Sequence, residues 1–240
     1  MKNSHNTSGV NATSFWEAGH SIAYDTIVQA LEPWNALDLI PTMITDYMSE
    51  HGSEDWLEPV SGVFVHRTAE IHESTILVGP AIIGAGSIIG PHAFIRHNVI
   101  IGDHCQVGNT SEVKQAILFD GVQIPHFNYV GDSILGYKAH LGAGAICSNY
   151  RSDQSEVQVY LPENTGSDPA ISTPDKRHST GLRKFGCLLG DMAEIGCNSV
   201  LNPGTLGERE IRVYPLSSVR GYIPANHIYK QDGTLVRIKE

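Results

Sequence analysis

Positive charge is scarce in this sequence, which has 16 Lys and Arg residues against 26 Asp and Glu residues and a formal net charge of −10. General nucleic-acid binding needs clustered Lys and Arg that neutralise phosphates, so this role is excluded. Long apolar runs are also lacking, and none approaches the roughly 18–20 residues needed to span a bilayer. We therefore expect neither a nucleic-acid partner nor a membrane partner.

Targeting signals and paired cysteines are lacking too. Residues 1–14 are polar, without the apolar core of a signal peptide, so we expect a disordered tail and a cytoplasmic protein. The four cysteines are widely spaced and form no CxxC pair: Cys105, Cys147, Cys187 and Cys197. This spacing argues against a disulfide framework and a thiolate zinc site, and it predicts buried free thiols.

A six-residue repeat dominates the middle of the chain. An aliphatic or aromatic residue recurs at one phase over nine consecutive steps: Ile71, Leu77, Ile83, Ile89, Ile95, Ile101, Val107, Val113 and Phe119. The spacing does not fit the helical period of 3.6. Glycine often follows the aliphatic position, which indicates tight corners. A short fixed period is typical of a solenoid whose coils pack on their neighbours, so we predict an all-β fold, a left-handed parallel β-helix.

The repeat is interrupted twice. Pro125 and Gly131 occupy the next two in-phase positions, and the pattern resumes out of register at Leu135. We interpret this slip as a loop ejected from the solenoid, because such loops often hold functional residues. A second excursion covers about residues 151–183, which are rich in Pro, Ser, Thr and Asp and have no six-fold phase.

The first sixty residues differ in kind from the repeat. Residues 21–31 have apolar side chains at a near-helical spacing, and residues 41–48 form a second short helix candidate. We expect a helical arm over residues 15–62, the β-helix over 63–223 and a C-terminal tail over 224–240. The arm contains all three tryptophans, Trp16, Trp34 and Trp56. It either packs these side chains on the solenoid or caps the open strand edge of the first coil.

The residues at the register slip resemble a known family. The sequence there is Ser111-Glu-Val-Lys-Gln-Ala-Ile-Leu-Phe-Asp-Gly-Val-Gln-Ile-Pro-His-Phe-Asn-Tyr-Val-Gly-Asp-Ser-Ile-Leu-Gly136, followed by Leu141-Gly-Ala-Gly-Ala-Ile-Cys-Ser-Asn-Tyr150. This resembles the C-terminal acetyltransferase domain of bifunctional enzymes of UDP-N-acetylglucosamine synthesis, which join a sugar-1-phosphate nucleotidylyltransferase to an amino-sugar-1-phosphate N-acetyltransferase. Residues 179–190 are similar to the archaeal branch, and the likeness covers about residues 63–223.

The resemblance implies an acetyl-CoA-dependent N-acetyltransferase that acts on an amino-sugar-1-phosphate such as glucosamine-1-phosphate. It also implies a homotrimer, with acetyl-CoA as co-substrate between neighbouring β-helices and the sugar phosphate beside it. His126 matches the family's general base. Arg96 and Lys114 match residues that hold the sugar phosphate, and Tyr129 matches a sugar-side contact. His140 stands where the bacterial enzymes have an Asn on the sugar side, so this chain differs from them at a position that contacts the acceptor.

Four further positions match the acetyl-CoA site of the family: Ala143, Asn149, Tyr150 and Cys197. A short basic stretch also suits the phosphates of CoA, because four of the sixteen basic residues fall within nine positions: Lys176, Arg177, Arg183 and Lys184.

The chemistry is coherent from the residue types alone. Acylation of an amine needs a base that removes a proton as the nitrogen attacks the thioester, and a His with a pKa near ~6.5 is suited to this task. Arg offers a bidentate fork to phosphate, and Lys offers a point charge. The sixty residues before the solenoid lack a Gly-x-Gly-Thr-Arg start, so nucleotidyl transfer is not expected, and a separate nucleotidylyltransferase is a candidate partner.

Two alternatives from other classes stay open at this point. Left-handed β-helices also host γ-type carbonic anhydrases, whose zinc is held by three His residues of adjacent subunits, and the chain has 12 His residues that include His92 and His97. The third ligand has no evident partner at that spacing, so we expect no metal. The other alternative is a non-catalytic scaffold or a protein that binds sugar nucleotides or CoA.

Overall fold

The computed structural model describes residues 9–162 and 174–239. Residues 1–8 of the expected disordered tail, and residues 163–173 of the expected excursion, lie outside the described residues. The prediction of a disordered tail is wrong for its second half: Val10 and Ala12 are buried, and the first helix begins at Ala12 because the side chain of Asn11 accepts a hydrogen bond from the backbone of Thr13.

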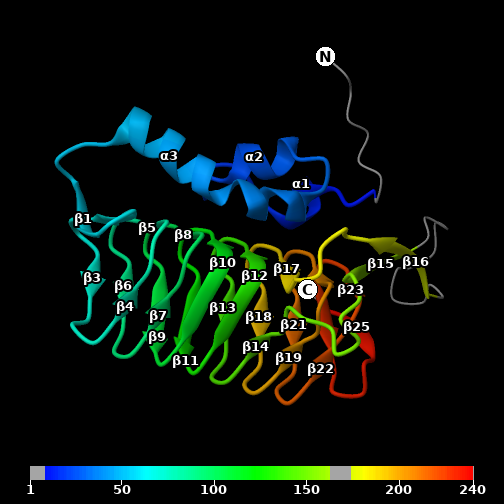
Figure 1. Cartoon of the computed structure of the whole chain (residues 1–240). Coiled ribbons are helices and arrows are strands. Elements are labelled where there is room, and N and C mark those ends of the chain that lie inside the picture. Colours follow the sequence, from blue (N-terminus) through cyan, green and yellow to red (C-terminus); the bar gives the residue numbers. More distant parts are fainter. Residues whose placement is uncertain (1–8, 163–173, 240) are drawn as a thin grey trace.

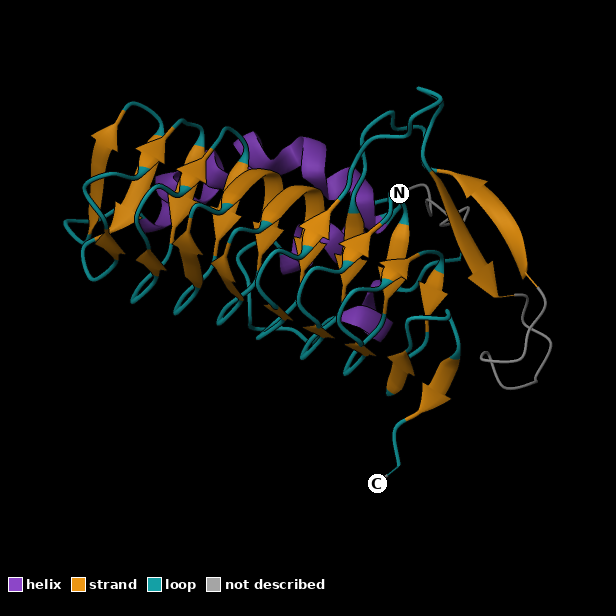
Figure 2. Ribbon diagram, turned by 90° about the horizontal axis from the view of Figure 1, so that it is seen from below, coloured by secondary structure: helices purple, strands orange, loops and turns teal. Residues whose placement is uncertain are grey.

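From β2 onward most of the described chain forms a parallel β-helix, as predicted (Figure 2). Its strands form three faces. Face A consists of β2 (Val63–His66), β5 (Ala81–Ile83), β8 (Val99–Ile101), the second halves of β10 (Glu112–Leu118) and β12 (Tyr129–Leu135), β17 (Cys187–Leu189), β20 (Thr205–Gly207) and β23 (Tyr222–Ile223).

The other two faces have shorter strands. Face B consists of β3 (Glu70–Ile71), β6 (Ile88–Ile89), β9 (Gln106–Asn109), β11 (Gln123–His126), β13 (His140–Leu141), β18 (Glu194–Ile195), β21 (Arg212–Val213) and β24 (His227–Tyr229). Face C consists of β4 (Ile76–Leu77), β7 (Phe94–Ile95), the first halves of β10 and β12, β14 (Ile146–Cys147), β19 (Val200–Leu201) and β22 (Ser218–Val219). The solenoid extends past residue 223, the end expected from the sequence, because β24 still pairs with β21.

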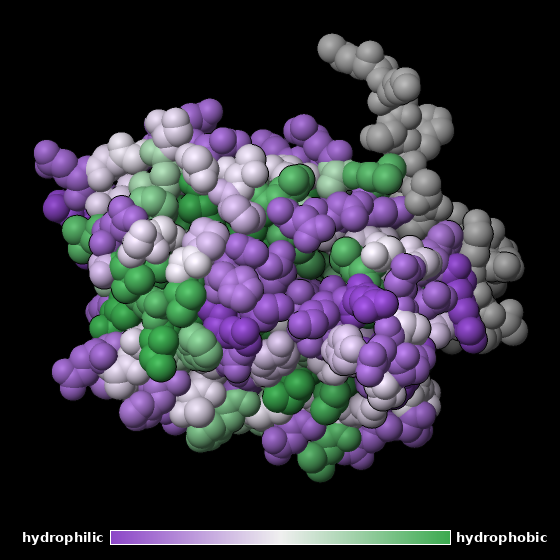
Figure 3. Space-filling view, in the orientation of Figure 1, coloured by the Kyte–Doolittle hydropathy of each residue, from purple (hydrophilic) through white to green (hydrophobic). Residues whose placement is uncertain are grey.

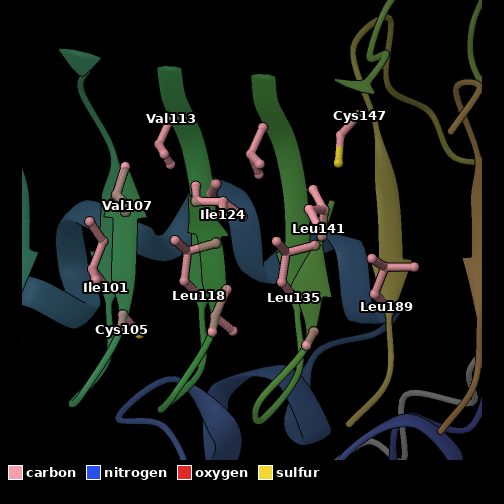
Figure 4. Packing of buried hydrophobic residues seen from close by; sticks show 14 of the residues in the cluster. Ile101, Cys105, Val107, Val113, Leu118, Ile124, Leu135, Leu141, Cys147 and Leu189 are labelled. Atoms are coloured by element: carbon pink, nitrogen blue, oxygen red, sulfur yellow. The ribbon is translucent and has the colours of Figure 1, made fainter. Parts of the chain in front are cut away.

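The six-residue repeat supplies the interior of the β-helix. In the regular coils, each residue pairs with the one 18 positions later, as Ile83 does with Ile101, so one coil equals three hexapeptides. The repeated aliphatic side chains point inward and form one continuous core with those of the next coils (Figure 4). This packing explains the strict phase in the sequence, since every inward position is filled by its neighbours above and below.

The sequence predicts a loop ejected from the solenoid at the slip in the repeat, and this prediction is wrong. Glu112 pairs with Phe94, 18 positions earlier, but Ala116 pairs with Val99, only 17 positions earlier. One residue is therefore lost at the corner between faces C and A, and β10 crosses this corner as one strand. The next coil is shortened in the same way, because Leu118 pairs with Leu135.

The shorter coil also changes the role of Phe119. The ninth step of the repeat falls on Phe119, but Leu118 takes the inward position and Phe119 packs outside the solenoid, where its ring lies 5.8 Å from that of Trp16. The corner is made by a single residue with a left-handed backbone, Gln115 in one coil and Asp132 in the next, with φ of 48° and 49°. Such a conformation turns the chain sharply, and Asp tolerates it better than most residues.

The N-terminal helices lie along face A (Figure 1). They are α1 (Ala12–Phe15), α2 (Tyr24–Gln29), the 3₁₀ helix η1 (Pro33–Leu39) and α3 (Ile40–His51). The outward side chains of face A are apolar and pack against them: Ile82, Ile100, Ile117, Ile134, Leu188 and Leu206. Strands buried on both sides are expected to be apolar throughout, as Val99–Ile101 is. The arm therefore packs on the side of the solenoid, and the edge of the first coil is covered by β1 (Trp56–Val60), which pairs antiparallel with β2.

The excursion leaves the solenoid at the same corner where the two short coils lose a residue. Ile134 pairs with Leu188, 54 positions later, so the insertion is about two coils long. It contains an antiparallel hairpin of β15 (Gln158–Pro162) and β16 (Pro174–Ser179), and its base is closed by a bridge between Tyr150 and Lys184. The last strand, β25 (Leu235–Arg237), pairs antiparallel with β24. Among the described helices, none has the length and apolar character needed to cross a bilayer.

We predict that Trp16→Ala destabilises the protein by about 3–5 kcal/mol, measured by urea unfolding. Trp16 is fully buried, and its Nε1 donates a hydrogen bond to the carbonyl of Leu189 at 2.9 Å. The matched control is Trp56→Ala, because the half-buried Trp56 side chain lies at the edge strand. Equal losses for the two variants would contradict the view that the arm is anchored at Trp16.

Candidate functional site

A buried ion pair lies at the corner between faces C and A. Lys114 precedes the one-residue corner of β10, and its Nζ lies 3.3 Å from Oδ2 of Asp132, the corner residue of the next coil. The two side chains are 12 % and 9 % exposed. Asn149, from the coil after that, donates a hydrogen bond from Nδ2 to the same carboxylate. Side chains from three successive coils therefore meet at Asp132.

Tyr129 joins this group through Asn149. The Nδ2 atom of Asn149 also donates to the hydroxyl of Tyr129, at 3.1 Å. Burial raises the pKa of the Tyr129 hydroxyl above its ordinary value. The hydroxyl therefore stays protonated, and can donate a hydrogen bond, up to a higher pH than an exposed tyrosine. Gly131 lies between the two: a Cβ there would come within 2.5 Å of the Tyr129 hydroxyl and 2.7 Å of the Asn149 amide. A side chain at position 131 would therefore displace the Tyr129 hydroxyl or the Asn149 amide.

Arg96 lies one coil before Lys114, on the outer side of face C. Its guanidinium pairs with Glu112 at 2.8 Å and lies 5.6 Å from the centre of the Phe94 ring. Glu112 stands next to Tyr129 in the strand register, so Arg96 borders the Lys114 cluster. The two side chains of this ion pair are 35 % and 34 % exposed, which leaves the guanidinium accessible to a ligand.

His126 lies at the opposite edge of face C, at the corner with face B. Its side chain is exposed, while its backbone N–H donates to Oδ1 of Asn128 at 3.0 Å. The turns stacked beside it hold Ala143 and Cys197: Gly144 donates to the His126 carbonyl and Asn198 to the Ala143 carbonyl. Tyr129 projects from face C between this corner and the Lys114 corner.

The nine residues selected from the sequence do not form one cluster within a single chain. Lys114, Tyr129 and Asn149 touch or share partners, whereas His126 lies across face C. His140 projects from face B, where its Nδ1 is 2.8 Å from Oε2 of Glu194. Because a six-residue step moves the chain to the next face, residues close in sequence point in different directions. Cys197 is exposed, so the prediction of a buried thiol is wrong at this position and holds for the other three cysteines.

An open pocket of about 480 Å³ adjoins Asp132 where the arm, the corner and the excursion meet. Its lining comes from all three parts: Leu37, Asp38, Gln115, Asp132, Tyr150, Leu182, Arg183 and Lys184. The side chain of Gln115 donates to the carbonyl of Leu37 at 2.8 Å and holds η1 against the corner. Two members of the expected basic stretch thus line the pocket, while Arg177 stacks on Tyr160 and the side chain of Lys176 lies outside the described residues.

Asp132 was not identified from the sequence. A Gly-Asp pair looks like an ordinary turn, and the role of Asp132 depends on the one-residue corner, whose position the slip in the repeat does not give. In the part of the chain that the structure describes, no group of three or more His, Cys, Asp and Glu side chains is arranged to hold a metal ion.

Comparison with known proteins agrees with the class of protein that the sequence resembles. The fold and the matched motifs define a C-terminal left-handed β-helix domain of the acetyltransferase type, as the resemblance in the sequence implied. A family model described as the GMPPB C-terminal domain matches residues 77–213, more than half of the chain, and the chain belongs to this family.

Individual relatives are bifunctional proteins. The chain is 30% identical over 202 residues to a bifunctional sugar-1-phosphate nucleotidylyltransferase/acetyltransferase of Sulfurisphaera tokodaii, covering 83% of this chain and 47% of the relative. It is 43% identical over 145 residues to the bifunctional protein GlmU of Leifsonia xyli, covering 60% and 27%. The chain thus spans about half the length of the curated relatives it matches, or less.

Among solved structures, the acetyltransferase domain of PglB from Neisseria gonorrhoeae in complex with acetyl coenzyme A is similar, with 15% identity and a TM-score of 0.38. The match covers 82% of this chain and 64% of that one.

We predict that Lys114→Met lowers the free energy of unfolding by about 3 kcal/mol, because it leaves the buried Asp132 carboxylate without its cation. The matched control is Arg96→Met, which removes a half-exposed ion pair and is expected to cost less than about 1 kcal/mol. Urea unfolding of both variants measures the difference. Equal losses of unfolding free energy in the two variants would show that burial does not make the Lys114–Asp132 pair more important than the Arg96–Glu112 pair.

Proposed function

We propose that this protein is an acetyl-CoA-dependent N-acetyltransferase that acts on an amino-sugar-1-phosphate, glucosamine-1-phosphate or a close analogue. The observation that most supports this is the meeting of Lys114, Tyr129 and Asn149 at one corner, although the resemblance matched them at positions on three different coils. The names of the relatives, which combine sugar-1-phosphate nucleotidylyl transfer with acetyl transfer, support the same class of substrate.

The proposed roles follow from the position and charge of each side chain. Arg96 and Lys114 offer two cations near one edge of face C, and these suit the phosphate of the acceptor. The hydroxyl of Tyr129 lies between them and His126 and suits a sugar hydroxyl. Tyr150, which follows Asn149, lines the pocket together with Arg183 and Lys184, and this side suits the acyl donor, with the phosphates of CoA at the two cations.

His126 is the proposed general base. As the amine nitrogen forms a bond to the thioester carbonyl carbon, His126 takes the proton that the nitrogen loses. The C–S bond then breaks, the acetyl group stays on the nitrogen, and the proton passes to the leaving thiolate to give free CoA. The side chain of His126 is exposed at its turn, so a substrate on face C can reach it.

The separation of His126 from the Lys114 corner supports a site formed between chains. We propose a homotrimer in which face C of one chain faces its neighbour. Apolar side chains are exposed on the first coils, and apolar surface gathers there at the left of Figure 3. Ile76 of face C is 58% exposed and Phe127, beside His126, is also 58% exposed, which favours contact with another chain.

We expect His126→Ala to reduce acetyl transfer by about 10²–10⁴-fold, because it removes the base and leaves the phosphate contacts in place. The measurement is release of free CoA from acetyl-CoA with glucosamine-1-phosphate and galactosamine-1-phosphate. His104→Ala is the control, since His104 is an exposed corner residue between faces A and B. CoA binding without turnover on either sugar would favour a different amine acceptor, and absence of CoA binding would favour a non-catalytic protein.

We expect the protein in solution to have the mass of three chains by analytical ultracentrifugation. Dilution to the monomer should abolish turnover, because the monomer separates His126 from the phosphate-binding cations. A fully active monomer would contradict the proposal of a site between chains.

A further inference from the structure

Asp132 is the point at which the parts of the proposed site are joined. Its carboxylate is shared by the ammonium of Lys114, at 3.3 Å, and the amide of Asn149. The residue is only 6% exposed, so a polar side chain is buried there with both of these partners. A buried carboxylate that accepts two hydrogen bonds holds its donors more firmly than one at the surface, because water competes less for them.

The two partners belong to different halves of the proposed site. Lys114 lies on the side assigned to the sugar phosphate, and Asn149 lies on the side assigned to the acyl donor. Asn149 also donates to Tyr129, so the chain of contacts runs from Lys114 through Asp132 and Asn149 to Tyr129. Each link joins two different coils, and the loss of one residue per coil puts Asp132 directly at the corner.

The main chain of Asp132 fixes a third part of the site. Its carbonyl accepts a hydrogen bond from the N–H of Gly186 at 2.8 Å, and the carbonyl of Asn149 accepts one from Phe185 at 3.0 Å. These bonds secure the returning end of the excursion, directly after Arg183 and Lys184. Asp132 thus bonds to Lys114, to Asn149 and to the backbone of Gly186 in the returning end of the excursion.

We propose that Asp132 is a positioning residue that couples the sugar-phosphate side of the site to the acyl-donor side by holding Lys114 and Asn149 at once. This proposal rests on the proposed function. Asp132 acts through its two partners: it sets the direction of the Lys114 ammonium and the Asn149 amide before the substrates bind. Such preorganisation lowers the cost of binding each substrate.

The test is Asp132→Asn, which keeps the left-handed backbone that Asp and Asn both tolerate and removes only the charge. Loss of charge-assisted hydrogen bonds is expected to raise the KM for the sugar phosphate and the KM for acetyl-CoA by about tenfold each. The kcat should change less than either KM, because His126 lies across face C and keeps its surroundings.

The matched control is Asp191→Asn. Asp191 is likewise buried, at 5% exposed, but its carboxylate accepts hydrogen bonds from the backbone of Glu17 and Tyr137, far from the pocket. This variant should lower the melting temperature and leave both KM values within about twofold. It separates the effect of neutralising any buried carboxylate from the effect at Asp132.

A double variant sharpens the test. Lys114→Met in the wild-type background should raise the KM for acetyl-CoA although Lys114 lies on the sugar side, and it should add nothing further in the Asp132→Asn background. If the wild type is active and Asp132→Asn leaves both KM values within about twofold, the coupling role is wrong and the proposed function stands. If the wild type neither transfers acetyl groups nor binds CoA, the proposed function is wrong and this proposal fails with it.

Discussion

Register between neighbouring coils is the constraint on which the structure depends. Each strand has only two to seven residues and is held by bonds to the coils before and after it, so no strand is stable alone. Fixed coil length keeps the inward aliphatic side chains stacked. A change of one residue must therefore be absorbed at a corner, since a slip within a strand would turn its core side chains outward. The corner between faces C and A absorbs three such changes in succession: two single deletions and one insertion of about two coils.

The proposed site lies at this corner because the two deletions and the insertion all occur there. A one-residue corner brings Lys114 and Asp132 together, and the insertion begins with Asn149 directly above them. The regular corners, such as the one that holds His104, present exposed side chains to solvent. The shared corner instead buries a charged pair, which is costly unless every partner is in place. The corner where the repeat is irregular is thus the place where the charged and polar side chains of the proposed site gather.

The fold was predictable because its cause is local and periodic: Ile71 to Val113 mark the interior at a fixed step, and the structure confirms their direction. Phe119 could not be assigned correctly, because the loss of one residue at Gln115 changes no residue type and leaves an apolar side chain at the expected phase. The helical arm was visible in the sequence, but its path was not, since nothing in residues 15–62 distinguishes the side of a solenoid from its end. Ile100 and Leu188 point outward and are covered by the arm, but the direction of their side chains is known only once the coils are placed.

The candidate site was predictable only as a list of residues. Motif likeness selected Lys114, Tyr129 and Asn149, and the structure brings them together. The distance between His126 and the Lys114 corner depends on which face each step of the coil reaches. Asp132 depends on a buried ion pair with Lys114, 18 positions earlier, in two short coils whose strand residues otherwise pair 17 positions apart. Contacts of this kind arise from the way that coils stack, and a single sequence does not contain them as a pattern.

The arm runs antiparallel to the axis along which the coils follow one another, so its first helix lies over the late coils and α3 lies over the early ones. Trp16 bonds to Leu189, and the backbone of Glu17 bonds to Asp191, so the first helix docks on coils made late in translation. Arg209 adds hydrogen bonds to the carbonyls of Thr13 and Trp16. On the ribosome, Trp16 gains its hydrogen-bond acceptor, the carbonyl of Leu189, only when the last quarter of the chain emerges, whereas α3 meets its coils early. The nascent protein therefore exposes apolar surface on face A for much of its synthesis, and closure of the arm over that face marks completion of the fold.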